Sequence, residues 1–193
     1  SPYQHPFKDL GGLPPFHRYS DSLKYIDNSM GLLFDKLEKD GVLKDTVIIV
    51  TSDHGEAFGQ HPENFTHSNH LYEESVKTPL FIKFPDQKSG YIVDKNTSHI
   101  DLSPTIVGIL RLTAPEIWLG QNIFSNNWEN RPHLIFTRAA KIKNGIVDGN
   151  YKYFYDRIEG DSWLFNLKSD PDEVNNIADT VSVDKLQQLK NEI

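Results

Sequence analysis

Apolar residues near the start of the chain recur at helical spacing. After Ser20, apolar side chains follow one another at steps of three or four residues, at Leu23, Ile26, Met30, Leu33 and Leu37. This period predicts an amphipathic helix with one buried face, because residues three and four apart lie on the same side of a helix. Ser20 or Asp21 can cap its beginning, and Gly41 can end it. Residues 1–17 carry prolines and other breakers without any period, and they predict an extended loop.

Two apolar runs further along the chain predict buried strands. Residues 46–52 are a continuous β-branched run of the kind found in parallel sheets covered on both faces, and residues 79–84 form a shorter second run. The segment between them is polar, His-rich and about twenty-five residues long, which favours a functional loop. Residues 102–110 predict another helix, with a proline in its first turn. This alternation predicts an α/β sandwich with a mainly parallel sheet.

The pattern changes beyond Gly120. Short aromatic and β-branched runs, separated by Asn, Gly and Asp, predict a small antiparallel sheet. A tight turn is expected at Asp148-Gly149-Asn150, and helical spacing over residues 183–193 predicts a terminal helix. The runs that predict strands are residues 134–138, 141–147, 151–155 and 163–166. We therefore divide the chain into an α/β part, residues 1–120, and a small antiparallel subdomain, residues 121–193.

Composition then excludes several classes of partner and chemistry. The 193 residues carry a formal charge of -7 and no cysteine. Disulfides, thiolate metal ligands and a cysteine nucleophile are therefore excluded within this sequence. A nucleic-acid partner is not expected, because phosphate binding needs clustered Lys and Arg. No apolar run approaches the ~20 residues that span a bilayer, so we expect no transmembrane segment in this chain.

One segment combines residue types that bind metals. Asp53 and His54 come directly after the predicted strand 46–52 and precede Gly55. In open α/β sheets the ligand crevice lies at this carboxyl end of the strands. A carboxylate oxygen beside an imidazole nitrogen suits zinc or manganese and, less typically, calcium or magnesium. Gly55 lets the backbone approach a bound anion.

An isolated Asp-His pair can also be a turn cap beside a surface histidine. Here three more histidines follow in the polar loop, at His61, His67 and His70. Histidine enrichment in a loop after a buried strand favours a metal or anion site.

Several phrases of the sequence resemble, in the same order, the sulfatase family of the alkaline phosphatase superfamily. The main phrases are Thr-Ser-Asp-His-Gly-Glu at 51–56, the His-rich stretch 65–74, Lys-Thr-Pro-Leu-Phe-Ile at 77–82 and Asp-Leu-Ser-Pro-Thr at 101–105. Tyr25, Asp27 and Gly31 agree with the family's preceding helix, and residues 148–153 and 164–173 agree with its closing strands. The resemblance implies an alkaline-phosphatase-like fold and hydrolysis of sulfate esters.

The resemblance also implies roles for individual residues. Asp53 and His54 match ligands of the metal that activates the nucleophile and neutralises the anionic oxygens of the ester. His67 matches a histidine that faces the substrate or, in relatives with two metals, the second metal; the alternative is a loop histidine with a structural hydrogen bond. Lys77 lies where relatives often have a basic residue, and it either pairs with the sulfate group or decorates the surface.

The other polar residues of this segment match the family less well. We expect His61 and His70 to be exposed to solvent. Glu73 and Glu74 are expected to form a solvated helix face rather than a catalytic pair.

The family's nucleophile has no counterpart in this chain. Sulfatases carry a Cys or Ser-x-Pro-x-Arg phrase whose Cys or Ser becomes formylglycine, and phosphotransferase relatives use Thr or Ser; neither phrase occurs here. The resemblance therefore places a formylglycine nucleophile and further metal ligands upstream, in an N-terminal half that the chain lacks. It implies a carboxy-terminal fragment that is inactive alone. The expected metal is calcium in a sulfatase, and zinc, manganese or magnesium in a phosphotransferase.

Other interpretations stay open. One is a phosphoglycerol or phosphoethanolamine transferase, or a phosphoesterase, of the same superfamily, because these relatives also carry Asp-His-Gly-Glu. A second is a non-catalytic metal- or anion-binding module, and a third is an unrelated α/β domain. The expected substrate is a sulfated or phosphorylated small molecule, glycan or lipid head group. The resemblance implies export, to the periplasm or to the outer face of a membrane.

Overall fold

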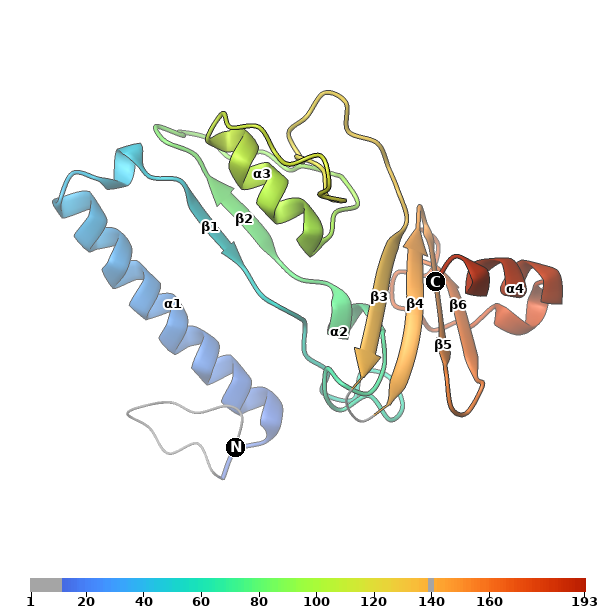
Figure 1. Ribbon diagram of the computed structural model, residues 1–193. Helices are drawn as coiled ribbons and strands as arrows, with labels where there is room; N and C mark the ends of the chain where they lie inside the picture. Colours follow the sequence, from blue (N-terminus) through green and yellow to red (C-terminus); the bar gives the residue numbers. More distant parts are fainter. Residues whose placement is uncertain (1–11, 139–140) are drawn as a thin grey trace. The chain divides into compact units, whose positions relative to one another are not determined.

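The computed structural model describes residues 12–138 and 141–193, which form two compact units (Figure 1). The first unit contains the described residues up to Thr66 together with Lys77–Gly90. The second contains His67–Val76 and Tyr91–Ile193. The predicted division at residue 120 stays a prediction, because these units are sets of packed segments that alternate along the chain.

Helix α1 (Pro15–Lys39) begins earlier than the sequence predicts. Pro15 occupies the first helical position, where a missing N–H leaves no hydrogen bond unmade, so the helix extends back through residues expected to be loop. The rest of the predicted loop, residues 1–11, lies outside the described residues. Gly41, at φ 73°, ends the helix. Its N–H donates to Glu38 O at 2.9 Å, and the Val42 N–H donates to Leu37 O at 3.0 Å.

The apolar face of α1 is not buried, contrary to the prediction. No residue of the helix is buried within the described part of the chain. Leu23, Ile26 and Leu33 are each about half exposed, at 46%, 51% and 54%. The helical period is correct, but a period cannot tell whether the partner that covers the face lies in the same stretch of sequence.

Strands β1 (Ile48–Thr51) and β2 (Leu80–Lys83) form a two-stranded sheet. Their directions are antiparallel, with Ile48 opposite Lys83 and Thr51 opposite Leu80. These two strands therefore do not meet the expectation of a mainly parallel sheet. A parallel pair needs a crossover of a dozen or more residues, usually a helix, whereas the helix between these strands, α2 (Glu73–Val76), has four residues.

A helical segment of the second unit carries a buried carboxylate. The 3-10 helix His99–Asp101 leads directly into α3 (Leu102–Ile109), close to the predicted helix. The Asp101 side chain is 1% exposed and accepts hydrogen bonds from the backbone N–H groups of Ser98, at 2.9 Å, and Gln121, at 2.7 Å. It also pairs with the Arg131 guanidinium. Asp101 therefore holds the chain after α3 against the start of that helix.

The small antiparallel sheet is confirmed. Its strands are β3 (His133–Arg138), β4 (Ile142–Asp148), β5 (Tyr151–Asp156) and β6 (Ser162–Asn166), in the order β3-β4-β5-β6. Asp148 pairs with Tyr151, and Gly149 takes φ 56°, which fits the predicted tight turn. The terminal helix α4 (Val183–Asn191) is also confirmed, and the Ser182 side chain caps its beginning.

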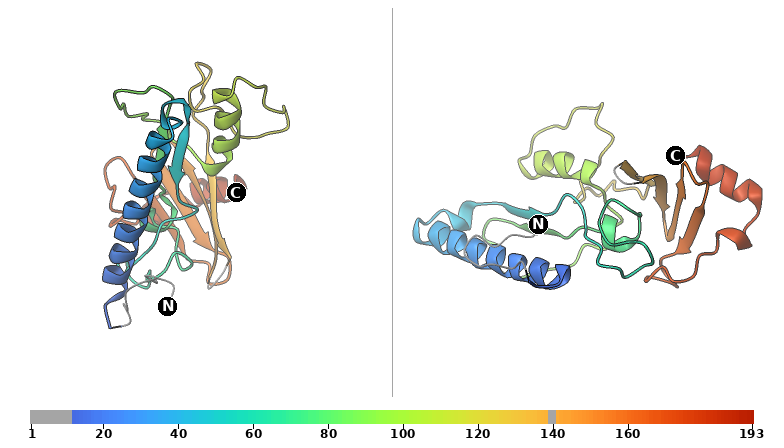
Figure 2. Two further views of the ribbon diagram at one scale, coloured as in Figure 1. Left: turned by 90° about the vertical axis from the view of Figure 1, so that its left-hand side faces the viewer. Right: turned by 90° about the horizontal axis from the view of Figure 1, so that it is seen from below.

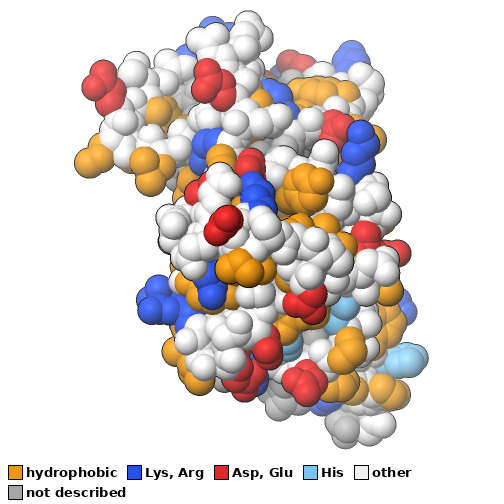
Figure 3. All heavy atoms as spheres, turned by 90° about the vertical axis from the view of Figure 1, so that its right-hand side faces the viewer, with side chains coloured by type: hydrophobic (Ala, Val, Ile, Leu, Met, Phe, Trp, Pro, Cys, Tyr) orange, Lys and Arg blue, Asp and Glu red, His pale blue; other side chains and the backbone are white. Residues whose placement is uncertain are grey.

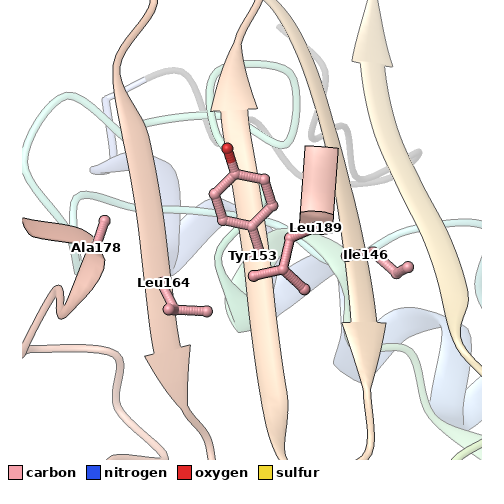
Figure 4. Packing of buried hydrophobic residues seen from close by; sticks show 5 residues of the cluster. All are labelled: Ile146, Tyr153, Leu164, Ala178 and Leu189. Atoms are coloured by element: carbon pink, nitrogen blue, oxygen red, sulfur yellow. The ribbon is translucent and has the colours of Figure 1, made fainter. Parts of the chain in front are cut away.

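The two faces of this sheet are covered by different segments. Successive side chains of a strand point to opposite faces, so Tyr153 and Phe154 lie on different sides of β5. On one side, α4 and the 3-10 helix Ala178–Thr180 pack on the sheet through the cluster of Ile146, Tyr153, Leu164, Ala178 and Leu189 (Figure 4). Figure 1 shows α2 on the other side of the sheet from α4, and the ribbon can be followed from two further directions in Figure 2. There Val76 of α2 and the residues Leu71 and Tyr72 before it pack on Phe154 and Phe165.

Charged side chains of both signs share the surface. On the face drawn in Figure 3, Lys and Arg lie among Asp and Glu and do not gather into a basic patch. Among the residues that the structure describes, every helix is too short or too polar to serve as a membrane-spanning segment.

A buried ion pair lies on the same sheet face as Phe154. The Lys143 ammonium is 2.8 Å from Asp156 Oδ2, and both side chains are 1% exposed. Burial acts to raise the pKa of the Asp156 carboxyl. Lys143 and the N–H groups of Ile158 and Glu159 have the larger combined effect, so its pKa lies well below the ordinary value. Asp156 therefore stabilises the fold in its charged form.

We expect Asp156→Asn to lower the free energy of unfolding at neutral pH by about 3–5 kcal/mol, because the buried Lys143 loses its charge partner. A depressed pKa in the folded state means that this contribution is present above the unfolded pKa, about 4, and is lost as the pH falls below it. The difference between wild type and variant should therefore shrink below pH ~4. Urea unfolding at pH 7 and pH 3 measures both effects; a difference independent of pH would contradict the assignment.

Candidate functional site

The end of β1 presents the predicted metal ligands. Thr51, the last residue of the strand, donates a hydrogen bond from Oγ1 to Pro79 O at 2.7 Å, which fixes the strand end to the residue before β2. The chain then leaves the sheet at Ser52, and Asp53 and His54 follow immediately. Their side chains are 89% and 43% exposed, respectively. The strand thus delivers both donors to its carboxyl end, as the sequence predicts.

Asp53 and His54 point to the same side. His54 Nε2 lies 3.7 Å from Asp53 Oδ2, and the His54 N–H donates to Asp53 Oδ1 at 3.1 Å. His54 Nδ1 lies 2.7 Å from Gly55 O. Because a carbonyl oxygen can only accept, Nδ1 carries a proton and donates to it, so in the neutral ring the lone pair is on Nε2.

This donor set fits a divalent metal. Metal-binding histidines commonly donate their second ring N–H to a carbonyl, which orients the ring, and His54 does so through Gly55. The carboxylate adds a hard oxygen beside the lone-pair nitrogen. Within the described ranges, no group of three or more His, Cys, Asp or Glu side chains is arranged to hold a metal ion. Asp53 and His54 would therefore supply two of the ligands of such a metal, and the described residues do not complete the set.

The loop after the site is held against the start of α1. Ala57 is fully buried, and the Phe58 ring packs on two aromatic rings of α1. It meets Phe16 edge-on at 5.4 Å and lies tilted against Tyr19 at 5.2 Å. These contacts fix the course of the backbone shortly after the two donors, within the first unit.

The other two predicted site residues belong to different units. Lys77 is exposed and lies in the first unit, between α2 and β2. His67 is exposed and opens the stretch His67–Val76, which belongs to the second unit. The structure therefore brings Asp53 and His54 together, and the roles of His67 and Lys77 stay predictions.

Two expectations for this stretch are wrong. His70 is 6% exposed, not solvated; its ring stacks on Tyr72 at 5.3 Å and meets Trp163 edge-on at 5.5 Å. Glu73 does not lie on a solvated helix face. It is 27% exposed and accepts a hydrogen bond from the buried Lys152 at 2.8 Å. Both residues face the four-stranded sheet, which residues more than fifty positions later in the sequence supply.

Lys152 and Glu173 form an ion cluster with Glu73 for which the sequence predicts no role. Lys152 is fully buried, and its ammonium lies 2.7 Å from Glu173 Oε1 and 2.8 Å from Glu73 Oε1. The Glu73 backbone N–H donates to Glu173 Oε2 at 2.6 Å. One sequence signal points to Lys152: in β5 it alternates with tyrosines and shares a face with Phe154, so it occupies an inward position.

The backbone around Glu173 is built to present its carboxylate. Asp170 accepts hydrogen bonds from the Val174 N–H at 3.1 Å and the Asn175 N–H at 2.8 Å, which closes a turn through Pro171. Glu173 then takes φ 51°, a left-handed conformation that L residues rarely adopt. A glycine would relieve this strain, so the residue is favoured for its side chain.

Burial raises the pKa of one group of this cluster, Glu173, and of one group beside it, Tyr72. Burial, and then the charges of Glu173 and Glu74, raise the pKa of the Tyr72 hydroxyl to about 12. Burial also raises the pKa of Glu173 above its ordinary value, with Lys152 acting in the opposite direction. Tyr72 therefore stays protonated at neutral pH.

Comparison with known proteins identifies the family. The sulfatase family model matches residues 5–112, and a model of the C-terminal part of N-sulphoglucosamine sulphohydrolase matches residues 63–193. A choline-sulfatase of Rhizobium meliloti is 29% identical over 170 residues, which cover 83% of this chain and 32% of that protein. An N-acetylglucosamine-6-O-sulfatase of Bacteroides thetaiotaomicron is 27% identical over 188 residues, which cover 88% of this chain and 33% of that protein.

Solved structures share the fold. A 2-O GAG sulfatase superposes with a TM-score of 0.73 at 17% identity, covering 91% of this chain and 40% of that one. A phosphonate monoester hydrolase from Silicibacter pomeroyi gives a TM-score of 0.69 at 21% identity, covering 86% and 37%. The predicted α/β, alkaline-phosphatase-like fold is thereby confirmed. The chain spans about a third of the length of the curated relatives that it matches. Since the sulfatase model alone matches more than half of the residues, the chain belongs to the sulfatase family.

Proposed function

We propose that the full-length protein is a metal-dependent hydrolase of sulfate esters, in which Asp53 and His54 are two ligands of the metal. The observation that carries the proposal is the arrangement at the end of β1. His54 Nε2 and Asp53 Oδ2 lie 3.7 Å apart, and Nδ1 of the same ring donates to Gly55 O. This arrangement places one imidazole nitrogen and one carboxylate oxygen of adjacent residues close enough to bind the same cation.

The remaining parts of the site are proposed to lie in the part of the protein beyond this chain. Two donors are fewer than the three protein ligands of a typical catalytic zinc site, and fewer still than calcium takes. The chain covers about a third of its relatives, which leaves room for more ligands and for the formylglycine nucleophile. The exposed apolar face of α1, with Leu23, Ile26 and Leu33, gives that part a surface to cover.

The four candidate site residues of this chain each have a proposed role in the reaction. A bound divalent metal supplies positive charge that favours ionisation of the nucleophile and offsets the charge of the sulfate oxygens. Asp53 and His54 would hold such a metal. As an oxygen of the nucleophile forms its bond to sulfur, the bond between sulfur and the alcohol oxygen breaks; His67 would pass a proton to that leaving oxygen, the Lys77 ammonium would neutralise charge on the group carried over to the nucleophile, and water would then release that group as sulfate. The substrate class is a sulfated small molecule, glycan or lipid head group.

The proposal is tested by comparing the full-length protein with the 193-residue chain. Both are incubated with an aryl sulfate, choline sulfate, a 6-sulfated N-acetylglucosamine and an aryl phosphate, with calcium, manganese, zinc or magnesium. We expect the full-length protein to release sulfate from at least one ester and the chain alone to match the metal blank. Turnover of the phosphate alone would replace the proposal with a phosphoesterase.

A second measurement separates an enzyme from a non-catalytic binding module. Calorimetric titration of the full-length protein with each metal should show uptake that Asp53→Asn weakens. Uptake without hydrolysis of any ester would indicate a binding module, and absence of uptake would reject the metal site.

A further inference from the structure

The stretch His67–Val76 packs against residues that are distant from it in sequence. It lies between β1 and β2, yet it belongs to the second unit, whereas both strands belong to the first. Its side chains Leu71 and Tyr72 are buried in a cluster with Phe154 and Phe165 of the four-stranded sheet. The sheet face opposite α4 is therefore built around this stretch.

A hydrogen bond fixes the residue next to His67. Thr137, in β3, is 9% exposed and donates from Oγ1 to Ser68 O at 3.0 Å. The register places Thr137 opposite Lys143, on the same sheet face as Phe154. The sheet thus reaches the backbone one residue away from the histidine that we propose faces the substrate.

The ion cluster fixes a second point of the stretch, at Glu73. Lys152 and Glu173 are fully buried and bind both the side chain and the backbone N–H of Glu73. Between the two anchors, the Tyr72 ring packs edge-on against Phe154 at 5.4 Å, and His70 packs against Trp163. The stretch is therefore held by one face of the sheet at Ser68, at Glu73 and between these two residues.

We propose that the antiparallel sheet β3–β6 sets the position of the active-site stretch His67–Val76, and that Thr137, Lys152 and Glu173 are positioning residues of the enzyme. This inference rests on the proposed function, because it takes His67 to act on the substrate. The residues work through the backbone on either side of the loop and touch no substrate. A displacement of about 1 Å of a substrate-contacting group can lower turnover about a hundredfold, so anchors of this kind control activity.

The experiment uses Thr137→Val in the full-length protein. Valine keeps the shape of threonine but cannot donate to Ser68 O. The matched control is Thr180→Val, which removes a similar bond, from Thr180 Oγ1 to Ile177 O at 2.8 Å, on the other side of the sheet. Thr137→Ser restores the hydroxyl and serves as the rescue variant. The readouts are kcat and KM for the sulfate ester, the melting temperature, and amide exchange of residues 67–72.

We expect Thr137→Val to lower kcat between about tenfold and a hundredfold and to speed amide exchange in residues 67–72 about fivefold, whereas Thr180→Val changes neither. Thr137→Ser should recover most of kcat. An unchanged kcat and exchange rate in Thr137→Val, or an equal loss in Thr180→Val, overturns the inference.

Failure of the proposed function is separable from failure of this inference. A wild type without turnover rejects the sulfatase proposal. In that case the exchange measurement alone decides the positioning role: faster exchange confined to residues 67–72 of Thr137→Val supports anchoring by the sheet, and unchanged exchange rejects it.

Discussion

His54→Ala in the full-length protein is expected to lower the hydrolysis of a sulfate ester by about a thousandfold or more. A catalytic metal contributes several kcal/mol of charge stabilisation to the transition state, and each 1.36 kcal/mol corresponds to about a factor of ten in rate. Of the two proposed ligands, removing the imidazole would leave only Asp53. Asp53→Asn should act in the same direction, because an amide oxygen carries no net charge to hold the cation.

The same two substitutions should leave the stability of the metal-free protein nearly unchanged. Asp53 is 89% exposed and His54 is 43% exposed, and substitutions at exposed sites usually change the free energy of unfolding by about 0.5 kcal/mol or less. His99→Ala and Asp45→Asn, which replace an exposed histidine and an exposed aspartate outside the site, are matched controls that should retain full activity. Rates measured with and without added metal, and melting curves in a chelator, separate the two effects. Activity near wild type in His54→Ala would reject its role as a ligand.

The sequence predicts the local elements well because their causes are local. The strands of the C-terminal sheet follow from short β-branched and aromatic runs, and the turn at Gly149 follows from a residue that tolerates φ 56°. The position of Asp53 and His54 directly after β1 follows for a similar reason, while their role as metal ligands stays a proposal. The apolar run ends at Thr51, which is the last residue of the strand, so the polar residues that follow leave the sheet at its carboxyl end; the strand itself is only partly buried, and not buried as the sequence predicts.

Properties that depend on distant residues are not predicted. The antiparallel pairing of β1 with β2 depends on the path of the long loop between them. A run of apolar residues predicts a strand but does not predict the strand's direction relative to its neighbour. The apolar period of α1 predicts that one face of the helix is apolar, but it does not identify which residues, if any, cover that face. His70 and Glu73 are predicted to face solvent, whereas they lie against Trp163 and Lys152, which are distant in sequence and belong to the four-stranded sheet.

Lys152→Met is expected to lower the free energy of unfolding of the full-length protein by about 3–5 kcal/mol, because removing one partner of a buried ion cluster leaves the others uncompensated. Methionine preserves the length and much of the volume of the lysine stem. What is lost is the ammonium between Glu73 and Glu173, at 2.8 and 2.7 Å. The control is Lys141→Met, whose ammonium lies 2.7 Å from Glu159 Oε1 with both side chains partly exposed at 34% and 52%; such pairs contribute about 0–1 kcal/mol.

The pH dependence of this loss distinguishes an electrostatic cause from a packing defect. Burial raises the pKa of Glu173 in the folded protein while Lys152 opposes the rise, so without Lys152 the pKa rises further. A carboxyl with a raised folded pKa contributes stability below its unfolded pKa, about 4.3, that is lost as the pH rises through the folded pKa. The deficit of Lys152→Met should therefore be largest at neutral pH and shrink towards pH 4.

Adding Glu173→Gln to Lys152→Met should recover part of the deficit at neutral pH, because the amide carries no charge and its oxygen can still accept from the Glu73 N–H. Urea unfolding of the four proteins of this double-mutant cycle at pH 7 and pH 4 measures the coupling. Additive losses that are equal at both pH values would instead assign Lys152 to packing alone.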